Sequence, residues 1–245
     1  MQSNQALLSI IPYYQECLYC GYVDRNLAGQ KCPGYGVVSD ETVAHFPESA
    51  YEYVILLEDY YQQKPSKVLE EYFEENILEM WTSGNPRVKE KPISDWKPMM
   101  VILFRSLFEL LLDHCLWKLI RVQLCPSPHS KEYAYFLLKQ FPSVSAKQGK
   151  CYPFVTQSKW KEDLKKFGFQ DLDELLKEAA RIRNEFIHAD DPTSGHHTTD
   201  FPERLRSEVP NLFTLFVQIA NEYYHPYAEE LSKIEVHQIA NVTGD

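Results

Sequence analysis

The sequence predicts a mostly helical protein of the all-α class that begins with a small irregular segment. Residues 1–45 contain three of the six cysteines and four of the nine glycines, with little periodicity. From about residue 47 onward, apolar residues recur at helical spacing, interrupted at 82–92 by a stretch rich in glycine, proline and polar residues. We therefore divide the chain into a small module (1–46), a helical connecting region with a linker (47–95) and a helical bundle (96–245).

The 245 residues carry 25 basic and 35 acidic side chains, a net charge of −10. This charge argues against a protein that coats nucleic acid nonspecifically, since phosphate contacts need a basic surface, but it permits local recognition of an RNA. The start of the chain has no basic segment before its apolar residues, and charged residues interrupt the most apolar stretch, 99–120. We therefore expect no secretion signal and no membrane span, and a cytoplasmic protein with reduced thiols.

Cysteine spacing near the start of the chain resembles a zinc ribbon, in which two turns each present a pair of metal-binding cysteines. Cys17 and Cys20 form one pair, and Cys32 begins a second turn that contains proline and glycine. The second pair is incomplete because Tyr35 stands where its second cysteine would be. Tetrahedral zinc needs four ligands, and His45 is the nearest candidate for the fourth, with a cysteine from the helical part as the alternative. We expect a structural zinc ion here; the competing interpretation is a reduced cysteine pair without metal.

Helical periodicity predicts six helices in the rest of the chain. They cover residues 51–60, 69–80, 98–124, 131–140, 171–188 and 210–223. The 98–124 helix is apolar on nearly all sides, apart from a polar stripe of Arg105, Glu109 and Asp113, and this pattern is typical of a central helix in a bundle. Between the fourth and fifth helices, Pro142, Gly149 and Pro153 indicate a loop. Pro210 suits the first turn of the last helix.

The clearest basic segment of this acidic chain is 147–166, with six lysines and two acidic residues. Three aromatic residues are interleaved with these lysines: Tyr152, Phe154 and Trp160. Such a pattern is typical either of a solvated helix face or of a surface that contacts an RNA backbone. On the second interpretation, Lys159, Lys161 and Lys165 are RNA-binding residues.

The helix predicted at 171–188 has a charge on its apolar face. Turning the helix by 100° per residue gathers six apolar residues on that face: Leu172, Leu175, Leu176, Ala179, Ile182 and Phe186. Arg183 falls about 20° from Leu172, where burying an unpaired ion costs several kcal/mol or more. Asn184 lies at the edge of the face, and His188 follows it by one turn. A guanidinium, an amide and an imidazole therefore lie at the end of one helix, and together they can hold a phosphate and move a proton.

Arg183, Asn184 and His188, in the segment RNEFIH, resemble the signature of the HEPN superfamily: an arginine, a polar residue, and a histidine four to six positions after the arginine. The resemblance covers about residues 96–231 and implies an up-and-down helical bundle that dimerises. It also implies a metal-independent endoribonuclease of toxin, abortive-infection or anti-phage systems, with an inhibitor or antitoxin protein as a partner. His188 would then act as general acid or base on the ribose 2′-hydroxyl or the leaving oxygen. Arg183 would clamp the scissile phosphate, Asn184 would orient the imidazole or the phosphate, and catalysis would need no cofactor.

The spacing of Arg183 and His188 sets a geometric constraint. Five residues at 100° place them about 140° apart on a straight helix, so one helix cannot easily direct both at one phosphate. Either the helix unwinds near Ile187, or two chains pair in a symmetric homodimer with a composite site. Glu109 and Asp113 of the central helix are candidates to hold Arg183 in place for substrate. The structural alternatives are a buried ion pair between Arg183 and one of these carboxylates, and His188 as a helix C-terminal cap.

Two functions are consistent with these residues. The first is an endoribonuclease, a toxin or anti-phage effector, whose zinc-ribbon-like module recognises substrate or a partner. The second is a non-catalytic binding or adaptor protein that acts through dimerisation and a partner protein or nucleotide. The chain has no glycine-rich phosphate-binding loop, so a transferase activity would have to come from a partner. Cleavage of RNA that depends on Arg183 and His188 separates the two functions.

Overall fold

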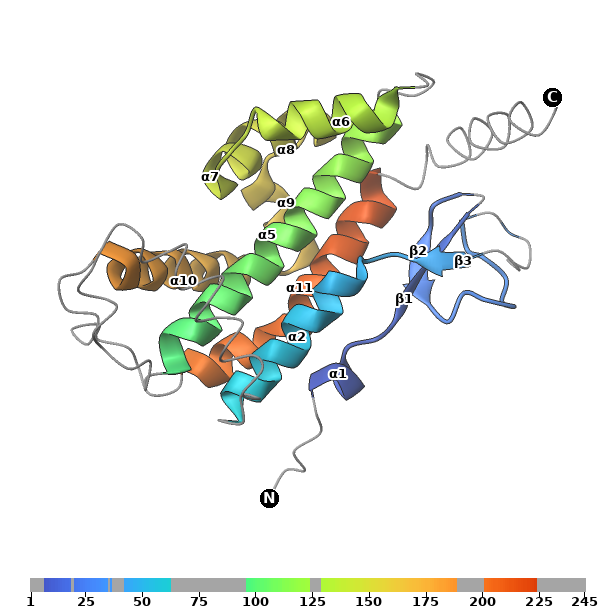
Figure 1. Cartoon of the computed structure of the whole chain (residues 1–245). Coiled ribbons are helices and arrows are strands. Elements are labelled where there is room, and N and C mark those ends of the chain that lie inside the picture. The colour runs from blue at the N-terminus through green and yellow to red at the C-terminus, as the bar shows by residue number, and fades with distance from the viewer. Residues whose placement is uncertain are drawn as a thin grey trace, which may run out of the picture. The chain divides into compact units, whose positions relative to one another are not determined.

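A computed structural model describes residues 7–18, 20–34, 36, 42–62, 96–123, 129–188 and 201–223. These residues form a mostly helical protein with one small antiparallel sheet (Figure 1). The predicted helical class is therefore confirmed, and a three-stranded sheet is added to it near the start of the chain. The predicted helix at 69–80 lies outside the described residues. None of the described helices is long and apolar enough to cross a lipid bilayer.

The chain folds into two compact units, and each unit takes residues from several parts of the sequence. Unit 1 contains helix α1, most of α2, the first half of α5, helix α10 and the first half of α11. Unit 2 contains the sheet, the second half of α5, helices α6 to α9 and the second half of α11. The domain boundaries that the sequence predicts at residues 46 and 95 stay predictions.

The sheet of unit 2 lies in the cysteine-containing part of the chain. Its strands are β1 (Tyr14–Cys17), β2 (Val23–Arg25) and β3 (Thr42–Ala44). Strand β1 lies in the middle and pairs antiparallel with both neighbours, in the order β2-β1-β3. Because β1 ends at Cys17, the turn that follows β1 places Cys20 near Cys17.

Helix α11 (Phe201–Tyr223) covers the outer edge of β2 with one side chain. The Asn221 amide accepts a hydrogen bond from the Val23 N–H (2.7 Å) and donates one to the Val23 carbonyl (2.8 Å). The rings of Phe46 and Phe213 meet edge to face, 5.0 Å apart. An uncovered strand edge can pair with another chain, so these contacts both protect the edge and fix the sheet within unit 2.

Unit 1 is joined by an ion pair between α2 (Glu48–Tyr61) and the first half of α11. The Glu58 carboxylate accepts two hydrogen bonds from the Arg206 guanidinium, at 2.8 and 3.2 Å. Two parallel hydrogen bonds of this kind fix the relative orientation of the Glu58 and Arg206 side chains as well as the distance between them. Helix α2 contains the helix predicted at 51–60 and confirms it; the short helix α1 (Leu7–Ile10) precedes the sheet.

Helix α5 (Trp96–Gln123) confirms the predicted central helix within two residues at its start and one at its end. Its apolar side chains are buried on nearly all sides, including Met100, Phe104, Phe108, Leu112 and Leu116 at 0% exposure. Helix α6 (Ser130–Lys139) confirms the next predicted helix.

The loop predicted at Pro142, Gly149 and Pro153 is wrong beyond its first residues, because residues 144–156 are helical. They form α7 (Val144–Ala146), the π-helical turn η3 (Lys147–Cys151) and α8 (Tyr152–Thr156), and α9 (Trp160–Phe167) follows. Ser143 caps the start of α7, its side chain accepting a hydrogen bond from the Ala146 N–H at 3.1 Å. Pro153 lies in the first turn of α8, where its missing N–H has no cost. The prolines therefore mark helix starts here and not a loop.

The prediction that the last helix starts at Pro210 is also wrong. Helix α11 begins at Phe201, and Pro210 lies inside it. An internal proline removes one backbone hydrogen bond to the residue four positions earlier. Buried apolar residues on both sides of it hold the helix in place: Leu205, Val209, Leu212 and Phe213, each 0% exposed.

Candidate metal centre

Three cysteines come together at the end of β1. The sulfur atoms of Cys17, Cys20 and Cys32 all lie within 4.8 Å of one another, and the three residues are buried. The Sγ atoms of Cys20 and Cys32 are 3.4 Å apart. Zinc–sulfur bonds of about 2.3 Å in a tetrahedron place two sulfurs slightly under 4 Å apart. The predicted meeting of the three cysteines is confirmed, and the site can hold a metal ion such as zinc.

Two turns of the same form carry these cysteines. The Gly21 N–H donates to the Cys17 carbonyl at 2.8 Å, and the Gly36 N–H donates to the Cys32 carbonyl at 2.7 Å. Both glycines have positive φ, 68° and 81°, a conformation that glycine adopts at little cost. Each turn therefore closes four residues after its first cysteine. In this alignment of the two turns, Tyr35 occupies the sequence position that corresponds to Cys20.

The surroundings of the sulfurs favour a soft cation. Burial, together with a hydrogen bond to the Cys32 sulfur, raises the pKa of Cys20 to about 12. Leu27 and Tyr22 pack against the cysteines and exclude water. Thiolates are the form that binds metal, so binding must displace protons. A divalent ion that prefers sulfur, such as Zn²⁺, supplies the positive charge that three buried thiolates need.

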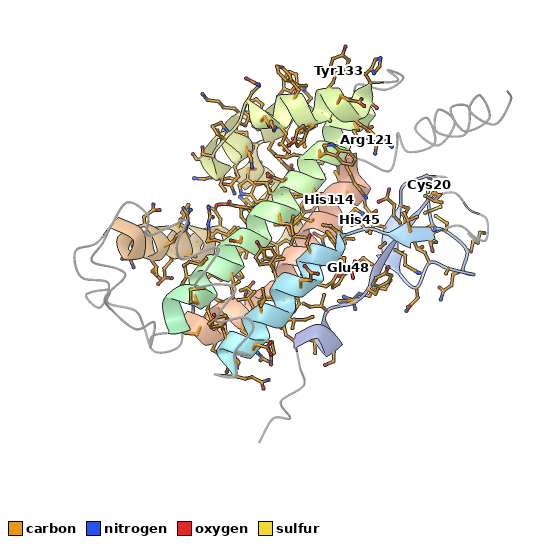
Figure 2. All side chains as sticks on the ribbon, viewed as in Figure 1. Cys20, His45, Glu48, His114, Arg121 and Tyr133 are labelled. Atoms are coloured by element: carbon orange, nitrogen blue, oxygen red, sulfur yellow. The ribbon has the colours of Figure 1, made fainter. Side chains whose placement is uncertain are left out.

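His45, the predicted fourth ligand, belongs to a different buried cluster. Its Nδ1 lies 2.8 Å from Oε2 of Glu16, and its backbone carbonyl lies 2.8 Å from Nε2 of His114. Lys118 donates to the same Glu16 oxygen and, at 3.3 Å, to the His45 carbonyl. Figure 2 shows His45 and His114 close together and Cys20 apart from them. This placement does not support the prediction that His45 completes the metal site.

We call the four side chains of this group the buried charge cluster: Glu16, His45, Lys118 and His114. The pKa values of Glu16 and the two histidines define which of these three are charged at neutral pH. Burial would raise the pKa of Glu16, but the bond from His45 and the Lys118 ammonium outweigh it and hold this pKa at about 2. Burial lowers the pKa of His45 to about 4. Burial and the nearby Lys118 charge lower the pKa of His114 to about 4 as well. At neutral pH one carboxylate therefore faces one ammonium, and both imidazoles are uncharged.

Helix α10 (Gln170–His188) carries the predicted catalytic residues in unit 1. Its apolar face is confirmed by the buried residues Leu172, Leu175, Leu176, Ala179 and Ile182. Arg183 is half-buried and Asn184 is exposed. The helix continues to His188, whose side chain lies outside the described ones. Helix α10 therefore continues past Ile187 without unwinding, and the homodimer with a composite site stays a prediction.

The two carboxylates predicted to hold Arg183 lie on α5. Glu109 is half-buried. Asp113 forms an ion pair with Lys147 of η3, with 2.6 Å between Nζ and Oδ1. This pair commits the Asp113 carboxylate to a contact inside unit 2, and it ties the π-helical turn to α5.

The basic segment is divided between paired and unpaired lysines. Lys159 pairs with Glu162 at 2.9 Å, whereas Lys161 and Lys165 are exposed and form no ion pair with any residue the structure describes. Two of the three interleaved aromatic residues, Tyr152 and Trp160, are buried and cannot contact a ligand. The aromatic part of the predicted RNA surface is therefore limited to Phe154 in this segment.

Sequence reasoning missed the buried charge cluster, and only one signal pointed to it. Lys118 lies on a helix that is apolar on nearly all sides, and such a charge needs a partner. The partner, Glu16, lies 102 positions away and has no pattern that marks it. Comparisons of the chain with models of protein families, with curated proteins and with solved structures gave no match.

Proposed function

We propose that this protein is an endoribonuclease of the HEPN type, a toxin or anti-phage effector, that cleaves RNA without a catalytic metal. The observation that carries the proposal is the position of Arg183 and Asn184 on α10, an uninterrupted amphipathic helix that ends at His188. Arg183 lies half-buried on the apolar side, and Asn184 is exposed beside it. A partly desolvated guanidinium next to an open surface suits the binding of a phosphate.

The proposed chemistry uses the ribose 2′-hydroxyl as the nucleophile. His188 or a second imidazole accepts the hydroxyl proton, and the oxygen attacks the adjacent phosphorus. The bond to the 5′-oxygen breaks, this oxygen takes up a proton, and a 2′,3′-cyclic phosphate and a 5′-hydroxyl result. Arg183 stabilises the charge that develops on the phosphoryl oxygens, and Asn184 orients the imidazole or the phosphate. Zinc has no part in this reaction and stabilises the sheet module.

The proposed active form is a homodimer. On a continuous helix Arg183 and His188 point about 140° apart, so a phosphate that meets both groups needs them from two chains. A symmetric pair of α10 helices provides two such composite sites.

The first test is cleavage of total RNA in EDTA. Wild type should cleave the RNA. Arg183→Ala and His188→Ala should each cleave it at least about 100-fold more slowly, since both groups act in the transition state. Arg181→Ala is the matched control, because Arg181 is exposed on the same helix and should keep nearly full activity. Equal loss in all three variants would contradict the proposal. Absence of cleavage by wild type on any RNA would favour the non-catalytic adaptor.

A further inference from the structure

Charge is distributed very unevenly along this chain. The stretch from Arg121 to Lys166 holds nine basic and three acidic residues, although the whole chain has 25 basic and 35 acidic ones. The remaining residues therefore carry twice as many acids as bases. The positive stretch falls within unit 2, on the end of α5 and on α6 to α9 (Figure 1). A positive region on an acidic protein attracts a polyanion to one place and repels it elsewhere.

Exposed aromatic rings lie in the same stretch. In the described ranges, five tyrosine and phenylalanine side chains are strongly exposed, and four of them lie on α6 and α8: Tyr133 at 52%, Tyr135 at 57%, Phe136 at 62% and Phe154 at 64%. Tyr133, which Figure 2 labels, and Phe136 are three positions apart on α6 and so are neighbours on its surface. Rings this exposed are not needed for the core, and sequence-tolerant stacking against bases is a use that suits them.

Six of the eight lysines of this stretch fall into two groups. Lys147, Lys159 and Lys166 are held by carboxylates of Asp113, Glu162 and Glu222. Lys150, Lys161 and Lys165 are exposed and have no ion pair among the described residues. Lys161 and Lys165 are four positions apart on α9 and share one side of it. Their charges are therefore available to phosphate groups.

We propose that the exposed surface of α6 to α9 binds single-stranded RNA. Bases stack on Tyr133, Phe136 and Phe154, and lysine ammonium groups of η3 and α9 contact the backbone phosphates. Exposed aromatic rings on a positively charged surface are how proteins bind single strands without reading sequence. This inference rests on the proposed function for the choice of RNA. The proposed surface extends beyond the segment 147–166, where the sequence predicts RNA contact, and includes α6.

Binding is measured with a fluorescent single-stranded RNA whose riboses are 2′-O-methylated, so that it cannot be cleaved. The variant Tyr133→Ala/Phe136→Ala should bind roughly tenfold or more weakly, since each lost stack weakens binding by about that factor. The variant Lys161→Gln/Lys165→Gln should also bind more weakly. Its slope of log affinity against log salt should fall by about 0.7 for each lost phosphate contact.

Matched controls remove similar groups elsewhere. Tyr13→Ala deletes an exposed ring outside the stretch, and Lys31→Gln removes an exposed charge outside it. Weaker binding by the test variants alone supports the proposal. Equal binding by test and control variants overturns it. A wild-type protein that binds no RNA also overturns it, whether or not it binds a protein ligand.

The two proposals fail separately. If the α6 and α9 variants bind RNA more weakly while Arg183→Ala and His188→Ala still cleave, the binding surface stands and the catalytic assignment is wrong. If cleavage depends on Arg183 and His188 but all variants bind RNA equally, the catalytic assignment stands and the surface is wrong.

Discussion

Glu16 and Lys118 show how single residues fix the sheet module. Glu16 lies in β1 immediately before Cys17, and its side chain is 7% exposed. Lys118 and His45 both meet one oxygen of its carboxylate. Breaking one partner of a buried ion pair is far more costly than losing a surface pair, because the other charge stays buried. The pair therefore holds β1, and with it Cys17, to α5 within unit 2.

We expect Lys118→Met to lower the free energy of unfolding by about 3 kcal/mol, since it leaves the Glu16 carboxylate buried without a cation. The double variant Glu16→Gln/Lys118→Met should lose less than the sum of the two single variants, because each single change removes the same interaction. Urea unfolding of the four proteins measures this. Strict additivity would show that the two side chains do not interact.

The two histidines of the buried charge cluster predict a pH dependence. Their pKa values are about 4 in the folded protein, below the ordinary 6.5. Between these values the unfolded chain binds more protons, so stability is complete above about pH 6.5 and falls as the pH decreases toward 4. Glu16, at about 2, extends the loss from about pH 4.5 downward.

The free energy of unfolding, measured with urea at pH 7, 6 and 5, should decrease by about 1 kcal/mol per histidine for each pH unit. His114→Gln should reduce this slope. A stability that is equal at pH 7 and pH 5 in wild type would contradict the assigned charge states.

At the scale of elements, the two cysteine turns are the best-defined feature. Their equivalent hydrogen bonds place Cys17 and Cys32 alike, and only the first turn supplies a second thiol. The site therefore has three sulfur ligands among the described residues. A fourth ligand to zinc would come from outside this group.

Zinc measured per chain after purification without chelator should be near one in wild type and close to zero in Cys20→Ser. Cys115→Ser is the matched control, because Cys115 is a buried cysteine of α5 that lies outside the group of three, and it should keep its zinc. Tyr35→Cys should slow the loss of zinc to a chelator, since it adds a thiol at the position that matches Cys20. Zinc near zero in wild type would contradict the metal site.

Long elements could be predicted from the sequence, while short ones and the buried charge cluster could not. Helices α5 and α10 have enough turns for periodicity to show. Pro153 and Pro210 misled the prediction, because proline is tolerated in a first turn and, where packing compensates, inside a helix. The three cysteines could be predicted because their spacing is local. The contacts of His45 with Glu16 and His114 could not be predicted, because both partners lie far from it in sequence.

At the scale of the whole molecule, two units share two helices. Helices α5 and α11 each begin in unit 1 and end in unit 2. The predicted catalytic residues lie in unit 1, whereas the cysteines, the buried charge cluster and the proposed RNA surface lie in unit 2. The proposed chemistry therefore lies in one unit and the proposed RNA binding in the other, and the proposed composite site needs a second copy of the chain.

The composite site is tested most directly with heterodimers of Arg183→Ala and His188→Ala, isolated through two different affinity tags. If each site takes Arg183 from one chain and His188 from the other, a heterodimer has one intact site of two and should cleave RNA at about half the wild-type rate. The two homodimeric variants should be inactive. A heterodimer as inactive as its parents, with wild type active, would contradict a site shared between two chains.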